Sequence, residues 1–319
     1  MRRLLILLFC LVSTIQASTG AKQPSQNAAL RYWMAFALMN DSTLSKEETA
    51  KLEAVVTGSS PWDEAQFGAL VDQNNEALRT MIRGSHLSYC DWGIEYSLGP
   101  DAPVAYLPKA RTLARLNVLY ARRLASQGNY DAATEALTAG IRFAQHLSQN
   151  ASFFGALMAK TAFGIHLAAI KQLADGGHFS RSNIVALQNS VRALPNDGLD
   201  WGSAAKVEAG AIHQAMLTLS HSTSPESLYT AWFSRPAPRD FRAPDTKNIA
   251  ALDGVMTTYA EVLTLPSSQA QSRLISLNQQ IAKADPVGAL MVPNPTRMLA
   301  ARTELISAVQ DTKTALAKN

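Results

Sequence analysis

Acidic and aromatic side chains that could bind a carbohydrate lie together in one short segment. Asp91 and Glu95 are interleaved with Trp92 and Tyr96, and Asp101 follows. A sugar site needs a ring to stack on and acids for hydrogen bonding or acid–base work. The alternative is that Trp92 anchors the segment in the core while Asp91 accepts backbone N–H bonds within a turn. Asp91, Trp92 and Tyr96 are therefore candidate ligand-binding residues, and Asp91 and Glu95 are candidate catalytic acids.

Glu208 is the third candidate acid. In a helix it shares one side with a set of apolar residues, namely Trp201, Ala204, Ala205, Ile212, Ala215 and Leu219. An acid on an apolar face either has a partner or has a raised pKa, and a raised pKa suits a general acid. A cleft shared with Asp91 or Glu95 would favour an enzyme. A bond to an arginine or to backbone N–H groups would make Glu208 a structural acid.

The other reactive side chains match no catalytic or metal-binding pattern. Cys90 lies four residues after His86, a pair that could form a nucleophile if the thiol pKa were lowered. A small buried side chain explains Cys90 equally simply. His166 lies in an apolar stretch and is expected to be a hydrogen-bonded core residue. Because the sequence contains no HExxH, CxxC, Walker, GxGxxG or GxSxG pattern, we predict no metal and no cofactor.

The N-terminal residues predict a signal peptide. Arg2 and Arg3 precede a short apolar run from Leu4 to Val12, and cleavage is expected after Ala17. An uncleaved anchor is the alternative. Removal of residues 1–17 would lower the formal net charge from +4 to +2 and leave Cys90 as the one cysteine. We therefore expect an exported protein, periplasmic or extracellular, with no transmembrane span after signal removal and no nucleic-acid partner.

Composition and periodicity predict an all-α fold. Hydrophobic residues make up 47% of the 319-residue chain and charged residues 17%, and the pattern gives about eleven helices and no convincing strand. Residues 18–319 are expected to form a single α-helical domain, an irregular helical array with proline-rich loops at about 234–245 and 285–295. The first helix, capped by Asn27, places several large apolar residues on one face, which are Leu30, Trp33, Met34, Ala37 and Leu38.

The candidate acids and rings between Asp91 and Asp101 lie in a segment without helical periodicity, residues 86–106, which we call the strap. It is expected to pack against the core through its aromatic residues. A helix over 108–127 follows, with Arg111, Arg115 and Arg122 largely off its apolar stripe. This basic face could meet an anionic surface, although a solvated helix face explains it equally well. The apolar stretch from Ser152 to Ala174 is expected to be a central buried helix.

Two resemblances concern this middle region. Gly128, Asn129, Tyr130 and Ala133, with Gly140 seven residues later, resemble the turn of a tetratricopeptide hairpin. The match covers about one repeat, so it implies a tetratricopeptide-like hairpin and not an array. In addition, NAALRYWMAFAL, CDWG, LPKARTLARL and the Gly-Asn-Tyr turn are similar to motifs of a large group of exported bacterial proteins of unknown function. That resemblance covers residues 27–200 and implies an exported all-helical fold but no reaction.

Two functions of different classes fit these observations. The leading hypothesis is a non-catalytic interaction or scaffold protein of the cell envelope that binds a peptide or protein. The alternative is an envelope hydrolase or glycan-active enzyme that uses carboxylates of the 86–106 strap together with Glu208. A structural subunit of a larger complex is a third hypothesis, and it would expose a large apolar patch.

Overall fold

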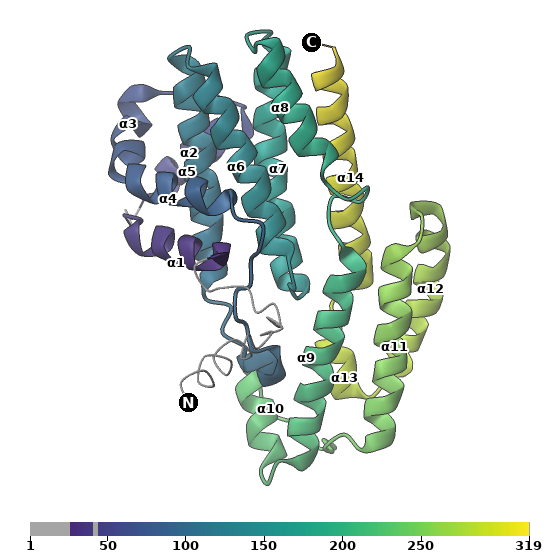
Figure 1. Cartoon of the computed structure of the whole chain (residues 1–319). Coiled ribbons are helices and arrows are strands. Elements are labelled where there is room, and N and C mark those ends of the chain that lie inside the picture. The colour runs from purple at the N-terminus through teal and green to yellow at the C-terminus, as the bar shows by residue number, and fades with distance from the viewer. Residues whose placement is uncertain (1–25, 41–43, 319) are drawn as a thin grey trace, which may run out of the picture.

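The computed structural model describes residues 26–40 and 44–318, and these residues fold into helices (Figure 1). Within them are fourteen α-helices, one 3-10 helix and no strand, so the all-α helical array predicted from the sequence is confirmed. An isolated bridge joins Asn27 to Tyr89. The predicted signal peptide, residues 1–17, lies outside the described residues.

The first half of the chain contains α1 to α7 and the 3-10 helix η2. Their bounds are Ala28–Leu38 (α1), Lys46–Thr57 (α2), Glu64–Gln73 (α3), Asn75–Ser85 (α4), Tyr96–Asp101 (η2), Tyr106–Ser126 (α5), Tyr130–Ser148 (α6) and Phe153–Asp175 (α7). The second half contains α8 to α14. Their bounds are Arg181–Arg192 (α8), Trp201–His221 (α9), Pro225–Phe233 (α10), Thr246–Thr264 (α11), Ser267–Lys283 (α12), Pro286–Met291 (α13) and Pro295–Ala317 (α14).

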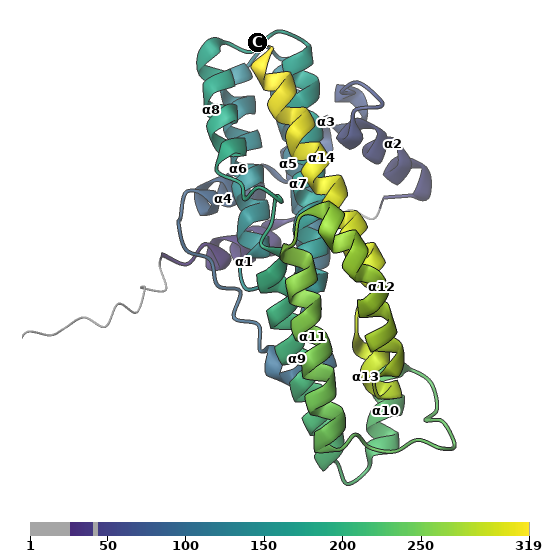
Figure 2. The same cartoon turned by 90° about the vertical axis from the view of Figure 1, so that its right-hand side faces the viewer.

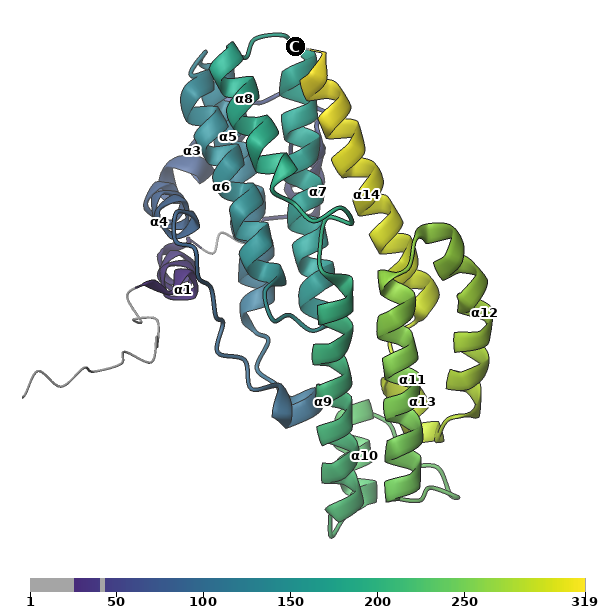
Figure 3. The same ribbon diagram turned by 45° about the vertical axis from the view of Figure 1, so that its right-hand side comes forward.

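The helices form two groups along one elongated molecule. In Figure 3, α5 to α8 and the upper part of α14 make one end, and α9 to α13 make the other. Helices α1 and α4 pack together beside α5 and α6, while α2 and α3 lie elsewhere around α5, as Figure 2 shows from another side. The long helix α14 packs against α7 and α8 in one group and α12 in the other, so it joins them.

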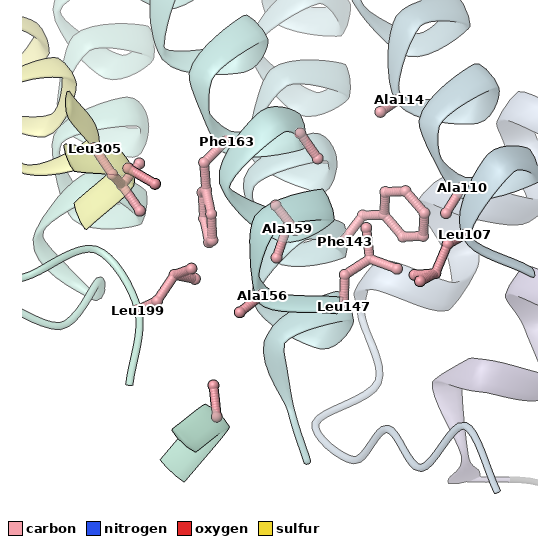
Figure 4. Packing of buried hydrophobic residues seen from close by; sticks show 14 of the residues in the cluster. Leu107, Ala110, Ala114, Phe143, Leu147, Ala156, Ala159, Phe163, Leu199 and Leu305 are labelled. Atoms are coloured by element: carbon pink, nitrogen blue, oxygen red, sulfur yellow. The ribbon is translucent and has the colours of Figure 1, made fainter. Parts of the chain in front are cut away.

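Helix α7 is the central helix of the first group. It packs against α5, α6, α9 and α14. Figure 4 shows Phe163 of α7 on the side of Leu305, and Phe143 of α6 directed toward Ala110 of α5. Among the described residues α7 is the helix long and apolar enough to cross a membrane, but 56% of its most apolar 18-residue window is buried. The expected central buried helix is therefore confirmed as a packed element of the core.

Local sequence signals set several helix starts. The Asn27 side chain accepts a hydrogen bond from the Ala29 N–H at the start of α1, and Ser45 forms a reciprocal capping box with Glu48 at the start of α2. Asn129 caps α6 in the same way. The helices α5 and α6 pack together as a hairpin around Gly128 to Tyr130. Its likeness to a tetratricopeptide unit stays a prediction.

Four helices differ from the predicted pattern. The sequence from Trp62 to Gly84, with acids in its first turn, predicts one helix. The Asn74 side chain instead donates to Leu70 O at 2.9 Å and accepts the Asn40 N–H at 3.0 Å, and the helix breaks there into α3 and α4. Two short helices, each with proline in its first turn, add to the predicted pattern: α10 ends just before the 234–245 loop, and α13 lies within the predicted 285–295 loop.

The apolar face predicted for α1 is turned to solvent. Leu30, Trp33, Met34 and Leu38 are each between 42% and 49% exposed. Tyr32 and the neighbouring alanines are buried instead, because α1 packs closely on α4. The sequence predicts Gly84 as the C-cap of the helix before the strap, but it lies inside α4, and a Cβ there would stand 3.0 Å from the Tyr32 ring. A glycine at this position therefore lets α1 and α4 approach each other closely.

The strap crosses from α4 to α5 and is anchored by Trp92. The Trp92 ring stacks on Tyr106 at a centroid distance of 4.5 Å, and its indole N–H donates to His146 O at 2.9 Å. Trp92 also stacks on Phe36 of α1. The ring is buried, so the expected packing of the strap against the core through an aromatic anchor is confirmed.

Candidate functional site

A pocket of about 280 Å³ lies where the far end of the strap meets α9 and α10. Most of its wall is apolar. The strap contributes Tyr96, Gly99, Pro100, Ala102 and Val104; the α6–α7 connection and the start of α7 contribute Ser152 and Phe154; α9 contributes Glu208, Ala211, Ile212 and Ala215; and α10 and α13 contribute Trp232, Phe233 and Met291. We call this the Glu208 pocket.

Close contacts hold η2 against its neighbours and so shape the pocket. Gly99 has a positive φ of 58°, and a Cβ there would stand 2.8 Å from the Cβ of Ala215, so a glycine lets η2 lie directly on α9. The Tyr96 hydroxyl accepts the Ser152 N–H at 3.2 Å. This bond ties the strap to the residue that precedes α7, which brings the strap, α7 and α9 together at one point.

Glu208 caps α7 from a different helix. Its Oε2 accepts the N–H of Phe153, the first residue of α7, at 3.0 Å. Ser152 occupies the N-cap position but makes no capping bond with its side chain. The positive end of the α7 dipole also faces this carboxylate. Glu208 therefore satisfies one of the N–H groups that a helix start leaves free.

The Glu208 carboxyl is partly desolvated and has no cationic partner in the described part of the chain. Burial raises its pKa above the usual 4.5, and the Phe153 N–H bond offsets only part of that rise. Two partly or fully buried tyrosines lie near it. The Glu208 charge adds to the burial that raises the pKa of Tyr96 and of Tyr259. The Tyr259 hydroxyl is buried and has no hydrogen-bond partner among the described residues.

Of the residues singled out from sequence, Glu208 and Tyr96 line this pocket and the others do not. Asp91 lies at the α1 end of the strap, where it accepts the Gly93 N–H at 3.0 Å and the Tyr89 hydroxyl at 3.2 Å. Its own N–H donates to Asn27 Oδ1 at 2.9 Å. Asp91 thus closes a turn and fastens the strap to α1.

Glu95 and Trp92 also lie away from the Glu208 pocket. Glu95 is exposed, and its nearest polar contact is the Ser97 hydroxyl at 3.5 Å. The Trp92 ring is enclosed by Tyr32, Phe36 and Tyr106, which leaves no open face for a ligand to stack on. The structure therefore does not bring Asp91 or Glu95 together with Glu208.

The cysteine and the histidines fill structural positions. Cys90 is 1% exposed, and burial raises its pKa to about 12, which disfavours the reactive thiolate. The His86 ring lies 3.8 Å from Glu135. His166 is buried and hydrogen-bonded to Ala162 O at 2.7 Å and to the Asn117 amide at 3.1 Å, so the core role expected for it is confirmed. Across residues 26–40 and 44–318, no three His, Cys, Asp or Glu side chains are grouped as metal ligands.

Several pocket residues were not identified from sequence. Ser152, Phe154, Trp232 and Met291 come from three segments, the start of α7, α10 and α13, that converge only in the folded chain. The Trp232 indole N–H donates to Asp101 Oδ2 at 3.0 Å, which places Asp101 beside a wall of the pocket. The proline that starts α10, after Ser224, is the one local signal that could have placed Trp232 on a helix.

No family model, curated protein or solved structure matches the chain. The geometry of the site therefore carries the functional argument.

Proposed function

We propose that this protein is a non-catalytic binding protein that receives a lysine side chain of a peptide or protein partner in the Glu208 pocket. The observation that carries the proposal is a partly buried carboxylate, without a cation, in a pocket whose other walls are mainly apolar. A lysine side chain has an apolar stem and a charged head. The stem fits the walls, and the ammonium group supplies the cation that Glu208 lacks.

The carboxylate has room for this contact. Glu208 Oε2 is engaged by the Phe153 N–H, whereas Oε1 has no hydrogen bond within the described residues. The rings of Phe154, Trp232 and Phe233 line the same pocket. Aromatic faces attract an ammonium group when they lie within about 6 Å of it. Both features favour a cationic guest over a neutral one.

The size of the pocket favours a side chain over a sugar chain. Pockets for drug-sized ligands measure about 300–1,000 Å³, and the Glu208 pocket measures about 280 Å³. One extended side chain can fill such a volume, whereas an oligosaccharide needs a longer groove. This comparison supports a peptide or protein partner.

The proposed setting is the cell envelope or the exterior. It rests on the N-terminal pattern of Arg2, Arg3 and the apolar run that follows. In that setting the protein would hold its partner without changing it.

A hydrolase is the second candidate, and one observation favours it. The raised pKa of Glu208 suits a general acid. Canonical glycosidases need two carboxyl groups about 5–10 Å apart, and Asp101, bonded to Trp232, is the acid at the edge of this pocket. The hydrolase hypothesis therefore becomes a Glu208 and Asp101 pair, in place of Asp91 and Glu95. It predicts that Asp101→Asn and Glu208→Gln each abolish the release of nitrophenol from nitrophenyl glycosides.

The binding proposal is tested by titration of acetylated, amidated pentapeptides of alanine with one central guest residue. The guest is lysine, acetyl-lysine, norleucine or glutamate, and the amide NMR signals of Ser152 and Phe153 report occupancy. The lysine peptide is expected to shift these signals until they saturate. Glu208→Gln is expected to lower the affinity for this peptide by about tenfold to hundredfold, because a hydrogen bond to a charged group contributes about 1.5–3 kcal/mol.

Two variants of α9 provide the matched comparison. Ala211 lines the pocket, so Ala211→Leu fills it and should abolish binding. Gly210 is exposed, and a Cβ added there would meet no atom within 4 Å, so Gly210→Ala should bind normally. Equal affinity for the lysine and norleucine peptides would overturn the proposal.

A further inference from the structure

We propose that a second pocket, distinct from the Glu208 pocket, binds a small aromatic carboxylate through the guanidinium of Arg122. This pocket measures about 240 Å³ and is lined by Trp62, Arg122, Ala125, Ser126, Tyr130 and Leu173. It lies where the end of α5, the start of α6 and the end of α7 meet the connection between α2 and α3. The inference is independent of the function proposed above.

Arg122 is a buried cation without an anion. The side chain was expected on the solvated basic face of α5, but it is only 8% exposed. Its guanidinium makes one hydrogen bond within the described chain, from Nη2 to Gln172 Oε1, and its Nε is buried with no partner. Burial alone lowers its pKa, and no acid opposes that effect. Enclosing a charge in this way is unfavourable unless something pairs with it.

The other shielded arginines show what is missing at Arg122. Arg302 is the second buried arginine of the described residues, and its guanidinium contacts Asp197 at 2.8 Å. Arg123, the next residue along the chain, binds Glu64 and Asp72 at 2.6 and 2.5 Å. In each case the fold supplies a carboxylate. At Arg122 it supplies an open pocket and a neutral amide.

The neutral amide holds the guanidinium in place. Gln172 accepts from Arg122 with its oxygen and donates from its nitrogen to Gly58 O, so it is fixed from both ends. A guanidinium has five N–H donors and binds a carboxylate through two parallel bonds. With one donor group engaged by Gln172, the group is oriented and still has donors to offer.

The rest of the pocket determines the body of the ligand. The rings of Trp62 and Tyr130 and the side chains of Ala125 and Leu173 give it flat, apolar walls. A cavity of about 150 Å³ is enough to hold benzene in another protein, so about 240 Å³ accommodates one ring with a carboxylate. No acidic residue is among those that line the pocket. Glu64, which accepts the Trp62 indole N–H at 3.0 Å, is itself paired with Arg123. A benzoate-like acid satisfies both the charge and the shape.

The experiment is a titration of the protein with benzoate at constant ionic strength, followed through the Arg122 Nε–H and Trp62 indole N–H signals. Benzamide has the same ring without the charge, and acetate has the charge without the ring. Benzoate is expected to bind at least tenfold more tightly than either. Arg122→Met is expected to lower the affinity for benzoate at least tenfold. Arg111→Met, the same change at an exposed position of α5, should leave that affinity unchanged.

A second pair of variants covers the case in which Arg122→Met does not fold. Ser126 is exposed and lines the pocket, so it tolerates substitution. Ser126→Glu brings a negative charge to the rim and should bind benzoate more weakly than Ser126→Gln, which has a similar size and no charge. The proposal is overturned if benzoate does not bind, if benzamide binds equally well, or if Arg122→Met binds benzoate like the unmodified protein. Equal benzoate binding by Ser126→Glu and Ser126→Gln would overturn it as well.

Discussion

Replacing Glu208 with glutamine is expected to alter the pH dependence of stability without unfolding the protein. The glutamine oxygen can still accept the Phe153 N–H that now lies 3.0 Å from Oε2. The variant loses the attraction between a carboxylate and the positive end of α7, which contributes about 0.3–1 kcal/mol. It also loses the desolvation penalty of a partly buried charge, which is the effect that raises the Glu208 pKa.

The direction in which Glu208→Gln changes stability with pH follows from proton linkage. Below the usual glutamate pKa of 4.5, Glu208 is protonated in both states and carries no penalty. As the pH rises above 4.5, the unfolded chain releases the proton first, so the native state becomes less stable until its own, higher pKa is passed. Each unit between the two pKa values is worth about 1.4 kcal/mol. The Glu208→Gln protein should therefore gain stability relative to the unmodified protein as the pH rises.

Urea unfolding followed by circular dichroism from about pH 4 to about pH 8 measures this difference directly. Glu95→Gln is the control, because Glu95 is an exposed acid outside the Glu208 pocket, and its difference from the unmodified protein should stay small throughout. The reasoning is refuted if Glu208→Gln becomes progressively less stable than the unmodified protein as the pH rises. That result would mean that the carboxylate is a stabilising ion with a lowered pKa.

Three further predictions concern the core. Trp92→Phe keeps most of the packing but leaves His146 O without its 2.9 Å bond, so urea unfolding should show a loss of about 1–3 kcal/mol, and an unchanged stability would contradict the anchoring role. Burial lowers the pKa of His146 and His166 from 6.5 to about 4. Each neutral ring therefore contributes about 3 kcal/mol to the free energy of unfolding, fully present above pH 6.5 and lost as the pH falls through 4. A glutamine at either position should make the free energy of unfolding less dependent on pH in this acidic range. Arg302→Met leaves Asp197 unpaired, and the Asp197 side chain is 33% exposed. The loss of unfolding free energy should therefore lie near the lower end of about 3–5 kcal/mol. Adding Asp197→Asn should recover part of that loss.

Features governed by neighbouring residues could be predicted from the sequence. The Asn27 cap was predicted, and the three-residue spacing of Ser45 and Glu48 indicates the second cap, because capping involves side chains and backbone within one turn. The break at Asn74 was missed because part of it depends on Asn40, which is distant in sequence. The face of α1 was misjudged because this helix is apolar on both sides, and the side that carries Tyr32 and Phe36 packs inward, with Tyr32 close to Gly84 of α4.

At the candidate site, too, some residues could be predicted from the sequence and others become apparent only in the folded chain. Glu208 was conspicuous as an acid on an apolar helix face, and Tyr96 as a ring in a segment without helical periodicity. Tyr96 and Glu208 accept hydrogen bonds from Ser152 and Phe153. No sequence pattern marks these two residues for this role, because they contribute backbone N–H groups. Asp91 has the residue type of a catalytic acid, but its oxygens accept the Gly93 N–H and the Tyr89 hydroxyl. Sequence reveals the type of a side chain, and only packing decides whether its oxygens remain free.

The measurement that tests the central claim most directly is a titration of the Glu208 carboxyl carbon by ¹³C NMR, with the signal assigned through Glu208→Gln. In the free protein the pKa is predicted to lie above 4.5. Addition of n-butylamine, a lysine side chain without its backbone, should lower that pKa, and the amine should bind more tightly as the pH rises through it, because the two effects are reciprocal. A Glu208 pKa at or below 4.5 that does not respond to the amine would contradict the account.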